Sequence, residues 1–253
     1  MFITLKQIGD LKPALSLLIP RERLADLENV FIKPNLGYMA PYPMTTSLNA
    51  LEETISYFKG IKSDLDLVIG EGSASQSSAL ENANKLGVMP LLQRENVQFV
   101  DLDQENYEVI DGIGIPEVVI NADFRVSLPC IKISRQSDLL LSCAIKNYLG
   151  IPSKAVHSEK EHHRRDKFHQ DIHGSIAEVY NAIQKAAPFE LHVVDGTTIL
   201  MGEENIGMEK SWGKILVGAD AEEIDLAICE KFNLNLPQYL ILLRTSSSKL
   251  QET

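Results

Sequence analysis

Polar side chains follow several short apolar runs of the sequence, and the first group comes after residues 30–32. Lys33 and Asn35 follow this run directly, while Thr45 and Thr46 precede a segment with helical periodicity. A lysine, an amide and the free N–H groups of a helix start all favour a bound carboxylate or phosphate. We therefore name these four as candidate ligand-binding residues. A Pro-Asn turn followed by a Ser/Thr helix cap would explain the same residues structurally.

A second group follows the apolar run 65–69. Glu71 lies between Gly70 and Gly72, so the backbone can approach a ligand closely, and Ser73 begins a serine-rich turn. Glu71 is a candidate general base or metal ligand, with Gly72 and Ser73 as candidate ligand-binding residues. The structural alternative for Glu71 is a solvated turn carboxylate. Because the chain contains neither a phosphate-binding loop nor a dinucleotide-binding fingerprint, the sequence gives little support to classical NTP or NAD binding.

A third group consists of Lys132, Lys146 and Asn147. Lys132 follows the run 124–128 and is a candidate catalytic residue, whereas Lys146 and Asn147 are candidate ligand-binding residues near the end of a predicted helix. A lysine in the last turn of a helix also offsets the helix dipole, which is a structural reason for Lys146. Parallel strands bring their carboxyl ends to one edge of a sheet, so we expect Lys33, Asn35, Glu71 and Lys132 to meet in one cleft.

Histidines form the fourth group. His169 and His173 are spaced i, i+4 and so are predicted to share a helix face, a geometry that can hold Zn²⁺ or another divalent metal. Either Glu71 or His163 is the candidate proton-transfer residue. A solvent-exposed, histidine-rich loop is the alternative explanation for all three.

The elements that must position these groups alternate along the chain. Apolar runs that predict strands lie at residues 30–32, 65–69, 97–100, 124–128, 191–194 and 214–217. Helices are predicted from Thr46 or Ser47 to Phe58, from Ser78 to Lys85, over 138–150 and from Asp220 to Phe232. This alternation predicts an α/β fold with a mostly parallel sheet flanked by helices in Rossmann-like layers; a mixed α+β arrangement is the alternative.

Residues 1–253 are predicted to form a single α/β domain, with or without an inserted lobe, and with a histidine-rich basic excursion at 153–168. We expect this excursion to be a lid-like loop or solvated helix with few anchors.

Composition excludes several classes of protein. With a net charge of -11 and a pI near 5.0, the chain repels nucleic acid, and its three cysteines are too few and too scattered for a disulfide framework. We find no secretion signal and no apolar stretch long enough to cross a membrane. The sequence therefore predicts a cytoplasmic protein that binds neither nucleic acid nor membrane, and it leaves the oligomeric state open.

Taken in order, these motifs resemble the domain-of-unknown-function 362 family, over residues 30–225. The matching segments are 30–35 with Thr45 and Thr46, 68–72, 123–132, 144–152, the histidine-rich segment, 194–196 and 219–225. The early strand and threonine motif is also similar, more distantly, to the N-terminal half of the nickel-pincer lactate racemases.

The chain departs from the family pattern in two places. The family usually has Leu-Pro-Lys-x-Lys-Thr-His where this chain has Cys130, Lys132 and Ser134, so a histidine is replaced by serine. Some members are joined to a ferredoxin-like iron-sulfur module, but this chain has no Cys-x-x-Cys-x-x-Cys run, and we expect no iron-sulfur cluster in it.

Two functions are consistent with these residues. The first is an enzyme acting on a small anionic metabolite, a carboxylate or a phosphate, with or without help from a divalent metal. The second is a non-catalytic protein that binds a metal or metabolite, or an accessory protein of a redox system. The sequence leaves open whether the protein is an enzyme, as well as its substrate, cofactor and reaction.

Overall fold

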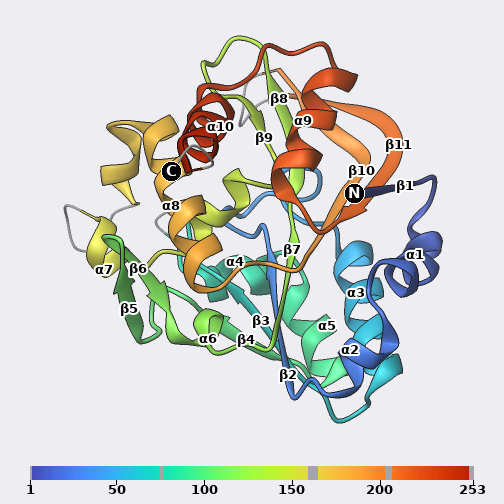
Figure 1. The fold of residues 1–253 in the computed structure, drawn as a ribbon. Coiled ribbons are helices and arrows are strands. Elements are labelled where there is room, and N and C mark those ends of the chain that lie inside the picture. Colours follow the sequence, from blue (N-terminus) through green and yellow to red (C-terminus); the bar gives the residue numbers. More distant parts are fainter. Residues whose placement is uncertain (1, 75–76, 159–164, 203–206, 251–253) are drawn as a thin grey trace.

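The computed structural model describes residues 2–74, 77–158, 165–202 and 207–250. Nine strands of the described residues form one sheet, whose main order is β1-β11-β10-β7-β2-β3-β4, with β8 and β9 continuing from β10. Helices cover both faces of this sheet (Figure 1). The predicted α/β fold with a mostly parallel sheet is confirmed.

Each of the six apolar runs identified in the sequence overlaps a strand, and two of them begin one residue before it. The strands are β1 (Phe2–Leu5), β2 (Asn29–Pro34), β3 (Asp66–Glu71), β4 (Gln98–Asp101), β5 (Tyr107–Ile110), β6 (Ile113–Pro116), β7 (Phe124–Leu128), β8 (Cys130–Ser134), β9 (Leu140–Ser142), β10 (Leu191–Met201) and β11 (Met208–Gly218). β5 and β6 form a separate antiparallel hairpin between β4 and β7 in the chain.

The helices connect the strands and pack on them. The α-helices are α1 (Leu11–Leu18), α2 (Arg21–Ala25), α3 (Leu48–Ile61), α4 (Ala79–Lys85), α5 (Val88–Glu95), α6 (Glu117–Ile120), α7 (Lys154–His157), α8 (Ile172–Ala186), α9 (Ala221–Lys231) and α10 (Gln238–Leu250), and the 3₁₀ helices are η1 (Ile8–Asp10), η2 (Lys146–Gly150) and η3 (Asp166–His169). In the described part of the chain, no helix is both long and apolar enough to span a bilayer.

Alternation along the parallel strands divides the core between the two faces of the sheet. On β2, Val30 and Ile32 pack with α1, α3 and α5, whereas Phe31 packs on the opposite face with residues of α8 and α9. β4, β3, β2, β7 and β10 run parallel, so their carboxyl ends lie along one edge. Lys33 and Glu71 lie at that edge because they end β2 and β3.

Side-chain caps begin three of the helices where the sequence predicts them. The Ser47 hydroxyl accepts from the N–H of Ala50 at the start of α3, and Ser78 and Glu81 form a reciprocal capping box on α4. Asp220 accepts two backbone N–H groups at the start of α9. Each cap satisfies donors that a helix leaves unpaired and thereby fixes the direction in which the chain leaves the sheet.

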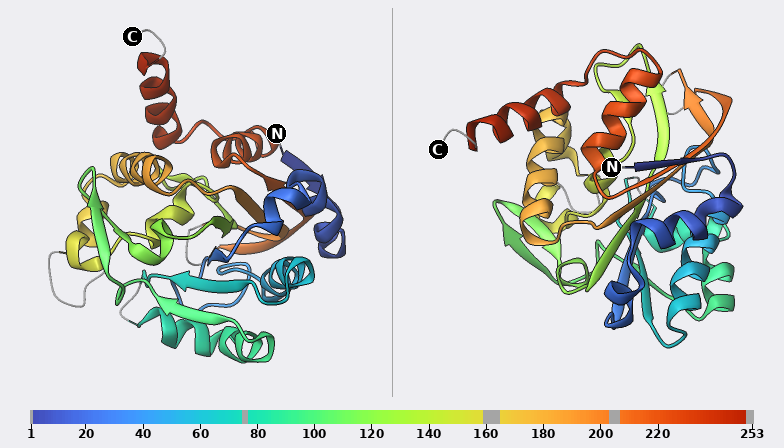
Figure 2. Two further views of the ribbon diagram at one scale, coloured as in Figure 1. Left: turned by 60° about the horizontal axis from the view of Figure 1, so that its bottom comes forward. Right: turned by 45° about the vertical axis from the view of Figure 1, so that its right-hand side comes forward.

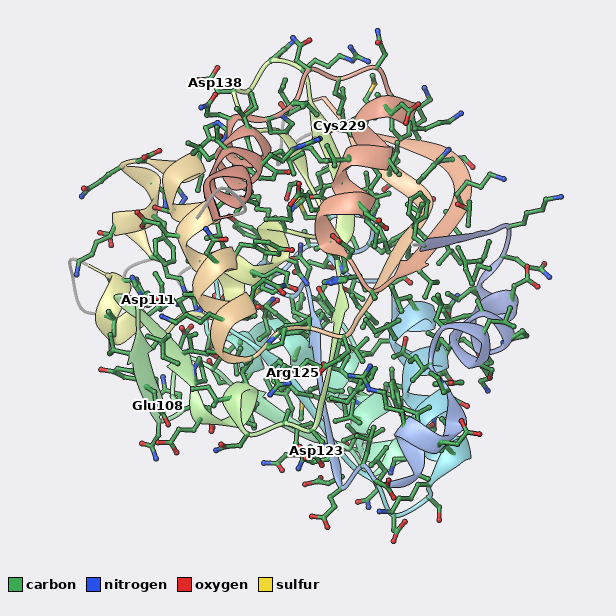
Figure 3. The ribbon with its side chains drawn as sticks, in the orientation of Figure 1. Glu108, Asp111, Asp123, Arg125, Asp138 and Cys229 are labelled. Atoms are coloured by element: carbon green, nitrogen blue, oxygen red, sulfur yellow. The ribbon has the colours of Figure 1, made fainter. Side chains whose placement is uncertain are left out.

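The sheet divides beyond Leu128. β7 pairs with both β2 and β10, but β8 pairs only with β10 and β9. Pro129 lies between β7 and β8, and proline has no N–H to continue a ladder. Figure 3 shows Asp123 beside the start of β7 and Asp138 beyond the end of β8, at opposite ends of the molecule. Lys33 of β2 and Lys132 of β8 both border a cavity at this division.

The helix predicted over 138–150 is wrong. Residues Leu140–Ser142 form β9, which pairs antiparallel with β8, and only Lys146–Gly150 are helical, as the 3₁₀ helix η2. Between them, the carboxylate of Asp225 on α9 accepts the N–H groups of Ala144 and Ile145 at 2.8 and 3.2 Å. Strand pairing and this tertiary contact replace the hydrogen bonds that a continuous helix would have made.

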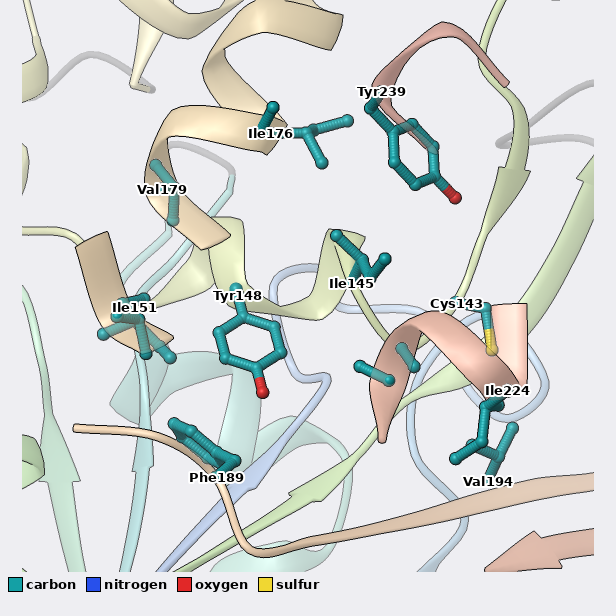
Figure 4. Close-up of a cluster of buried hydrophobic side chains, with 14 of the residues drawn as sticks. Cys143, Ile145, Tyr148, Ile151, Ile176, Val179, Phe189, Val194, Ile224 and Tyr239 are labelled. Atoms are coloured by element: carbon teal, nitrogen blue, oxygen red, sulfur yellow. The ribbon is translucent and has the colours of Figure 1, made fainter. Parts of the chain in front are cut away.

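A cluster of buried aromatic and aliphatic side chains packs against η2. Tyr148 packs against Phe189 with ring centroids 5.0 Å apart, and Ile145, Cys143 and Ile224 continue the cluster toward α9 (Figure 4). The tyrosine ring is fully buried although it belongs to a segment of only five residues. This burial fixes the position of the neighbouring Lys146 and Asn147.

The C-terminal helix α10 projects away from the rest of the structure (Figure 2). Its first turns are attached, because Tyr239, Leu240 and Leu243 are buried and the Tyr239 hydroxyl donates to Asp225 at 3.2 Å. Asp225 therefore joins α10, α9 and the segment before η2 through one carboxylate.

The expectation that the excursion 153–168 has few anchors is wrong for its described residues. His157, Arg165 and Phe168 are all buried, and the His157 ring packs against that of Phe168 at 4.5 Å between centroids. His157 Nε2 also accepts the N–H of Gly114. The sequence did not indicate these contacts, because a buried arginine or histidine cannot be distinguished from an exposed one by residue type alone.

Candidate functional site

A cavity of about 510 Å³ lies where the sheet divides. Eight of the predicted site residues border it: Lys33, Asn35, Glu71, Gly72, Lys132, Lys146, Asn147 and His169. The predicted meeting of Lys33, Asn35, Glu71 and Lys132 in one cleft is therefore confirmed. The residues Thr45, Thr46, Ser73 and His173 do not border it, and His163 lies outside the described residues.

Lys33 and Glu71 form a buried ion pair at the ends of β2 and β3. Lys33 Nζ lies 2.7 Å from Glu71 Oε1, and the two side chains are 1% and 2% exposed. The ammonium also donates to the carbonyl oxygen of Pro34 and to Asn147 Oδ1, so its three protons are used. Glu71 accepts further from the N–H groups of Leu36 and Gly72. Both groups therefore bind protein rather than presenting free polar atoms to the cavity.

Burial governs the protonation of this pair. Removal from water lowers the pKa of Lys33 and raises the pKa of Glu71, while the charge of each partner opposes the shift in the other. Such a pair is costly to break, because removing one partner leaves the other buried without compensation.

Two glycines allow the backbone to pack against this pair. The N–H of Gly72 donates to the carbonyl oxygen of Gly150, and a Cβ on Gly150 would overlap Glu71 Oε1 and approach Lys33 Nζ at 2.7 Å. A Cβ on Gly72 would overlap the guanidinium of Arg165. Gly72, which follows Glu71, thus allows other groups of the protein to approach closely.

The first prediction concerns Gly150. Gly150→Ala places a methyl group against the buried pair, so we expect a loss of about 1–3 kcal/mol in the free energy of unfolding, measured by urea denaturation. Gly60→Ala is the matched control: no atom lies within 4 Å of the added Cβ, and the position is inside α3. It should be neutral or stabilise by up to about 1 kcal/mol. Equal stabilities of the two variants would contradict the role of Gly150.

Arg165 is a buried residue of the site that the sequence analysis missed. Its guanidinium donates to the carbonyl oxygens of Pro152, Ser73 and Gly150 and pairs with Asp103 at 2.7 Å. It therefore joins the end of the excursion to the loop after β3. No local pattern distinguishes it from the other basic residues of this segment of the sequence.

Lys132 differs from Lys33 in that the described part of the chain provides it with no partner. It is 6% exposed on β8, directly opposite Ser142 of β9, and both residues border the cavity. Among the described residues, none makes a hydrogen bond or ion pair with the Lys132 ammonium. A buried ammonium is stabilised by an anion or by another polar partner.

The hydroxyls of Thr45 and Thr46 bind backbone. Thr46 Oγ1 accepts the N–H of Asn35 at 2.7 Å and donates to the carbonyl oxygen of Leu128 at 2.6 Å. It joins β2 to β7 at the point where their direct pairing ends. Thr45 Oγ1 donates to the carbonyl oxygen of Ala40 at 2.6 Å. Both hydroxyls hold the loop after β2, which fixes Asn35 at the cavity.

The same loop is tied to β10 through Asp195. Its carboxylate accepts from the hydroxyls of Ser47 and Tyr42 at 2.6 and 3.0 Å, and from the N–H and hydroxyl of Thr197. Desolvation is the main cause that raises the pKa of Tyr42, which keeps this phenol protonated as a donor. Asp195, which belongs to a motif noted in the sequence, thus positions the loop after β2 that contains Thr45 and Thr46. Asp195 itself does not border the cavity.

The two candidate metal-binding histidines do not share a helix. His169 ends η3, whereas His173 belongs to α8, which begins after its N-cap Asp171. The same-face argument from i, i+4 spacing therefore fails here, because the helix is interrupted between them. No group of three or more His, Cys, Asp or Glu side chains in the described ranges is arranged to hold a metal ion. The three cysteines are buried thiols.

Fold and site together define an α/β protein with a polar cavity at the carboxyl ends of its parallel strands. A family model described as "Domain of unknown function (DUF362)" matches residues 30–230, which is most of the chain. The chain belongs to this family, as the order of its motifs predicts. A search of curated proteins finds no significant match. The more distant similarity to nickel-pincer lactate racemases stays a prediction.

Proposed function

We propose that the cavity binds a small anionic metabolite, a carboxylate or a phosphate, and that Lys132 provides the charge that binds it. The observation behind this proposal is the buried Lys132 ammonium without a partner in the described part of the chain. Burying the Lys132 ammonium costs desolvation free energy, and water alone would compensate this cost poorly. An oxyanion would compensate it better, because it forms a charge-assisted hydrogen bond.

Neighbouring groups support an anion over a neutral ligand. Lys146 borders the same cavity, and the carboxylate of Glu71 is neutralised by Lys33. Asp138 also borders the cavity but is exposed, so water screens its charge. The Asn35 amide makes no hydrogen bond with a described residue and can donate to an oxyanion.

A non-catalytic binding protein is the second candidate function. The observation that favours it is the full engagement of Glu71, whose carboxylate accepts from Lys33, Leu36 and Gly72 while only 2% exposed. A general base must reach the proton that it removes, and Glu71 does not offer a free oxygen at the cavity surface. Catalysis therefore requires a different titratable group in the cavity.

The second prediction tests anion binding directly. Oxalate and sulfate, as planar and tetrahedral probes, should bind the full chain with a Kd that Lys132→Met raises at least about tenfold, because the charged hydrogen bond is lost. Isothermal titration calorimetry measures this at low ionic strength. A preference for oxalate would indicate a carboxylate ligand, and a preference for sulfate a phosphate.

Lys185→Met is the matched control for net charge. Lys185 pairs with Asp111 on the surface, 64% exposed, so its loss removes the same charge without touching the cavity. Its Kd should stay within about twofold of the unmodified protein. Equal weakening by both substitutions, or no binding of either probe, would refute the proposed function.

A further inference from the structure

His169 borders the cavity from the end of η3, and its ring has a defined hydrogen-bond partner. Nδ1 lies 3.2 Å from the carbonyl oxygen of Arg165. A carbonyl oxygen only accepts hydrogen bonds, so Nδ1 bears the proton at this contact. In the neutral ring Nε2 is then the unprotonated nitrogen, and no described residue hydrogen-bonds to it.

The group that selects this tautomer is itself fixed. Arg165 is buried, and its guanidinium is bound by Asp103 and by three backbone carbonyl oxygens. A backbone carbonyl that holds Nδ1–H is the usual means by which a protein presents Nε2 as a base or ligand. Sequence spacing had suggested a metal for this histidine, but the interrupted helix separates it from His173.

We propose that His169 exchanges a proton through Nε2 with the anion bound in the cavity. This inference rests on the proposed function, in which Lys132 binds that anion. The protonated ring donates Nε2–H to an oxygen of the ligand. The neutral ring takes a proton from an ionisable O–H of the ligand, and the electron pair of the broken O–H bond stays on the ligand oxygen. The ligand class is a small oxyanion with such a group. Oxalate and sulfate have no ionisable O–H near neutral pH and therefore test the donation of Nε2–H alone.

Other charged groups face the same space and must be separated from His169 by experiment. Those that border the cavity are Lys33, Glu71, Lys132, Asp138, Lys146 and Arg165. Lys154 and His157 on α7, and Asp171 and His173 at the start of α8, belong to elements packed against η3. Imidazole is the side chain that ordinarily changes charge between about pH 6 and 8, so replacement of single histidines isolates the effect.

The third prediction is a pH dependence of binding that His169→Gln removes. Oxalate and sulfate keep their charge between about pH 6 and 8, and we expect the unmodified chain, without an affinity tag, to bind them about tenfold more tightly at the lower pH. Glutamine retains a polar side chain but does not titrate. In His169→Gln the two Kd values should agree within about twofold.

His192→Leu is the control, since His192 is buried on β10 and does not border the cavity. It should retain the tenfold pH dependence. The inference is overturned if His169→Gln keeps that dependence or if His192→Leu removes it. Nitrogen-15 NMR of the ring gives a readout without ligand: Nδ1 of His169 should be the protonated nitrogen at high pH. An Nε2–H tautomer would overturn the inference while leaving the binding by Lys132 intact, whereas loss of all binding would refute the proposed function first.

Discussion

Replacing Lys33 by methionine should reduce the free energy of unfolding by about 3–5 kcal/mol, because the Glu71 carboxylate is then left buried without its counter-charge. For a chain of this size, this corresponds to a fall in melting temperature on the order of 10 °C. The remaining N–H donors of Leu36 and Gly72 soften the loss without cancelling it. Urea denaturation of the variant and the unmodified protein measures the difference.

A double-mutant cycle distinguishes the pair from general disturbance of the core. Lys33→Met combined with Glu71→Gln should be more stable than the sum of the two single losses predicts, by at least about 1 kcal/mol. The surface pair Lys185–Asp111 has a similar length, 2.8 Å, but is 64% and 57% exposed. Lys185→Met should therefore cost no more than about 1 kcal/mol. Additive losses in the cycle would contradict a coupled buried pair.

Lowering the pH should partly restore the stability of the Lys33→Met variant. Burial raises the pKa of Glu71, and loss of the Lys33 charge removes the largest opposing effect. A carboxyl whose pKa is higher in the folded state than in the unfolded state contributes stability at low pH that is lost as the pH rises. The deficit of the variant relative to the unmodified protein should therefore shrink from about pH 8 to about pH 5.

Much of the fold could be predicted from sequence because local signals agree with the tertiary structure. The continuous apolar runs at 30–32 and 65–69 form parallel strands covered on both faces, and the Ser78–Glu81 capping box begins α4 as predicted. The segment 138–150 failed because its hydrogen bonds are made with β8 and with Asp225, far away in sequence.

The sequence could predict which residues lie at the site, but it could not predict what each of them does there. Strand ends place Lys33, Glu71 and Lys132 at one edge irrespective of how they pair. Which lysine neutralises Glu71 depends on the division of the sheet after Leu128, since β2 ends beside β3 while β8 follows β10. That division leaves Lys132 without a partner among the described residues. No sequence pattern indicates it except Pro129.

Side chains that hold the site from outside were the hardest to assign. Asp195 and Asp225 belong to motifs recognised in the sequence, yet each acts by accepting several hydrogen bonds from distant segments. A carboxylate that accepts such bonds fixes a loop as firmly as regular secondary structure does. The family motifs at these positions therefore preserve the shape of the cavity without bordering it.

His192 is a buried titratable group that none of these networks satisfies. It lies on β10 with no exposed surface, and neither ring nitrogen has a hydrogen-bond partner in the described part of the structure. Burial lowers the pKa of His192 to about 3. An unfolded histidine has a pKa of about 6.5, so between these values the unfolded state binds more protons than the folded state. The contribution of His192 to stability therefore falls as the pH drops below about 6.5.

His192→Leu should remove this sensitivity to acid. Relative to the unmodified protein, the variant should gain about 2 kcal/mol in unfolding free energy between about pH 7.5 and pH 5, because leucine has no proton to bind in the unfolded state. At neutral pH it should be neutral or stabilising, since no hydrogen bond is lost.

His157→Leu is the contrasting control. Burial and the nearby Arg165 lower the pKa of His157 to about 4, but its Nε2 accepts the N–H of Gly114. Its replacement should therefore cost about 1–3 kcal/mol in unfolding free energy at neutral pH. Urea denaturation across this pH range measures both variants, and an acid sensitivity of His192→Leu equal to that of the unmodified protein would show that His192 is not the group responsible.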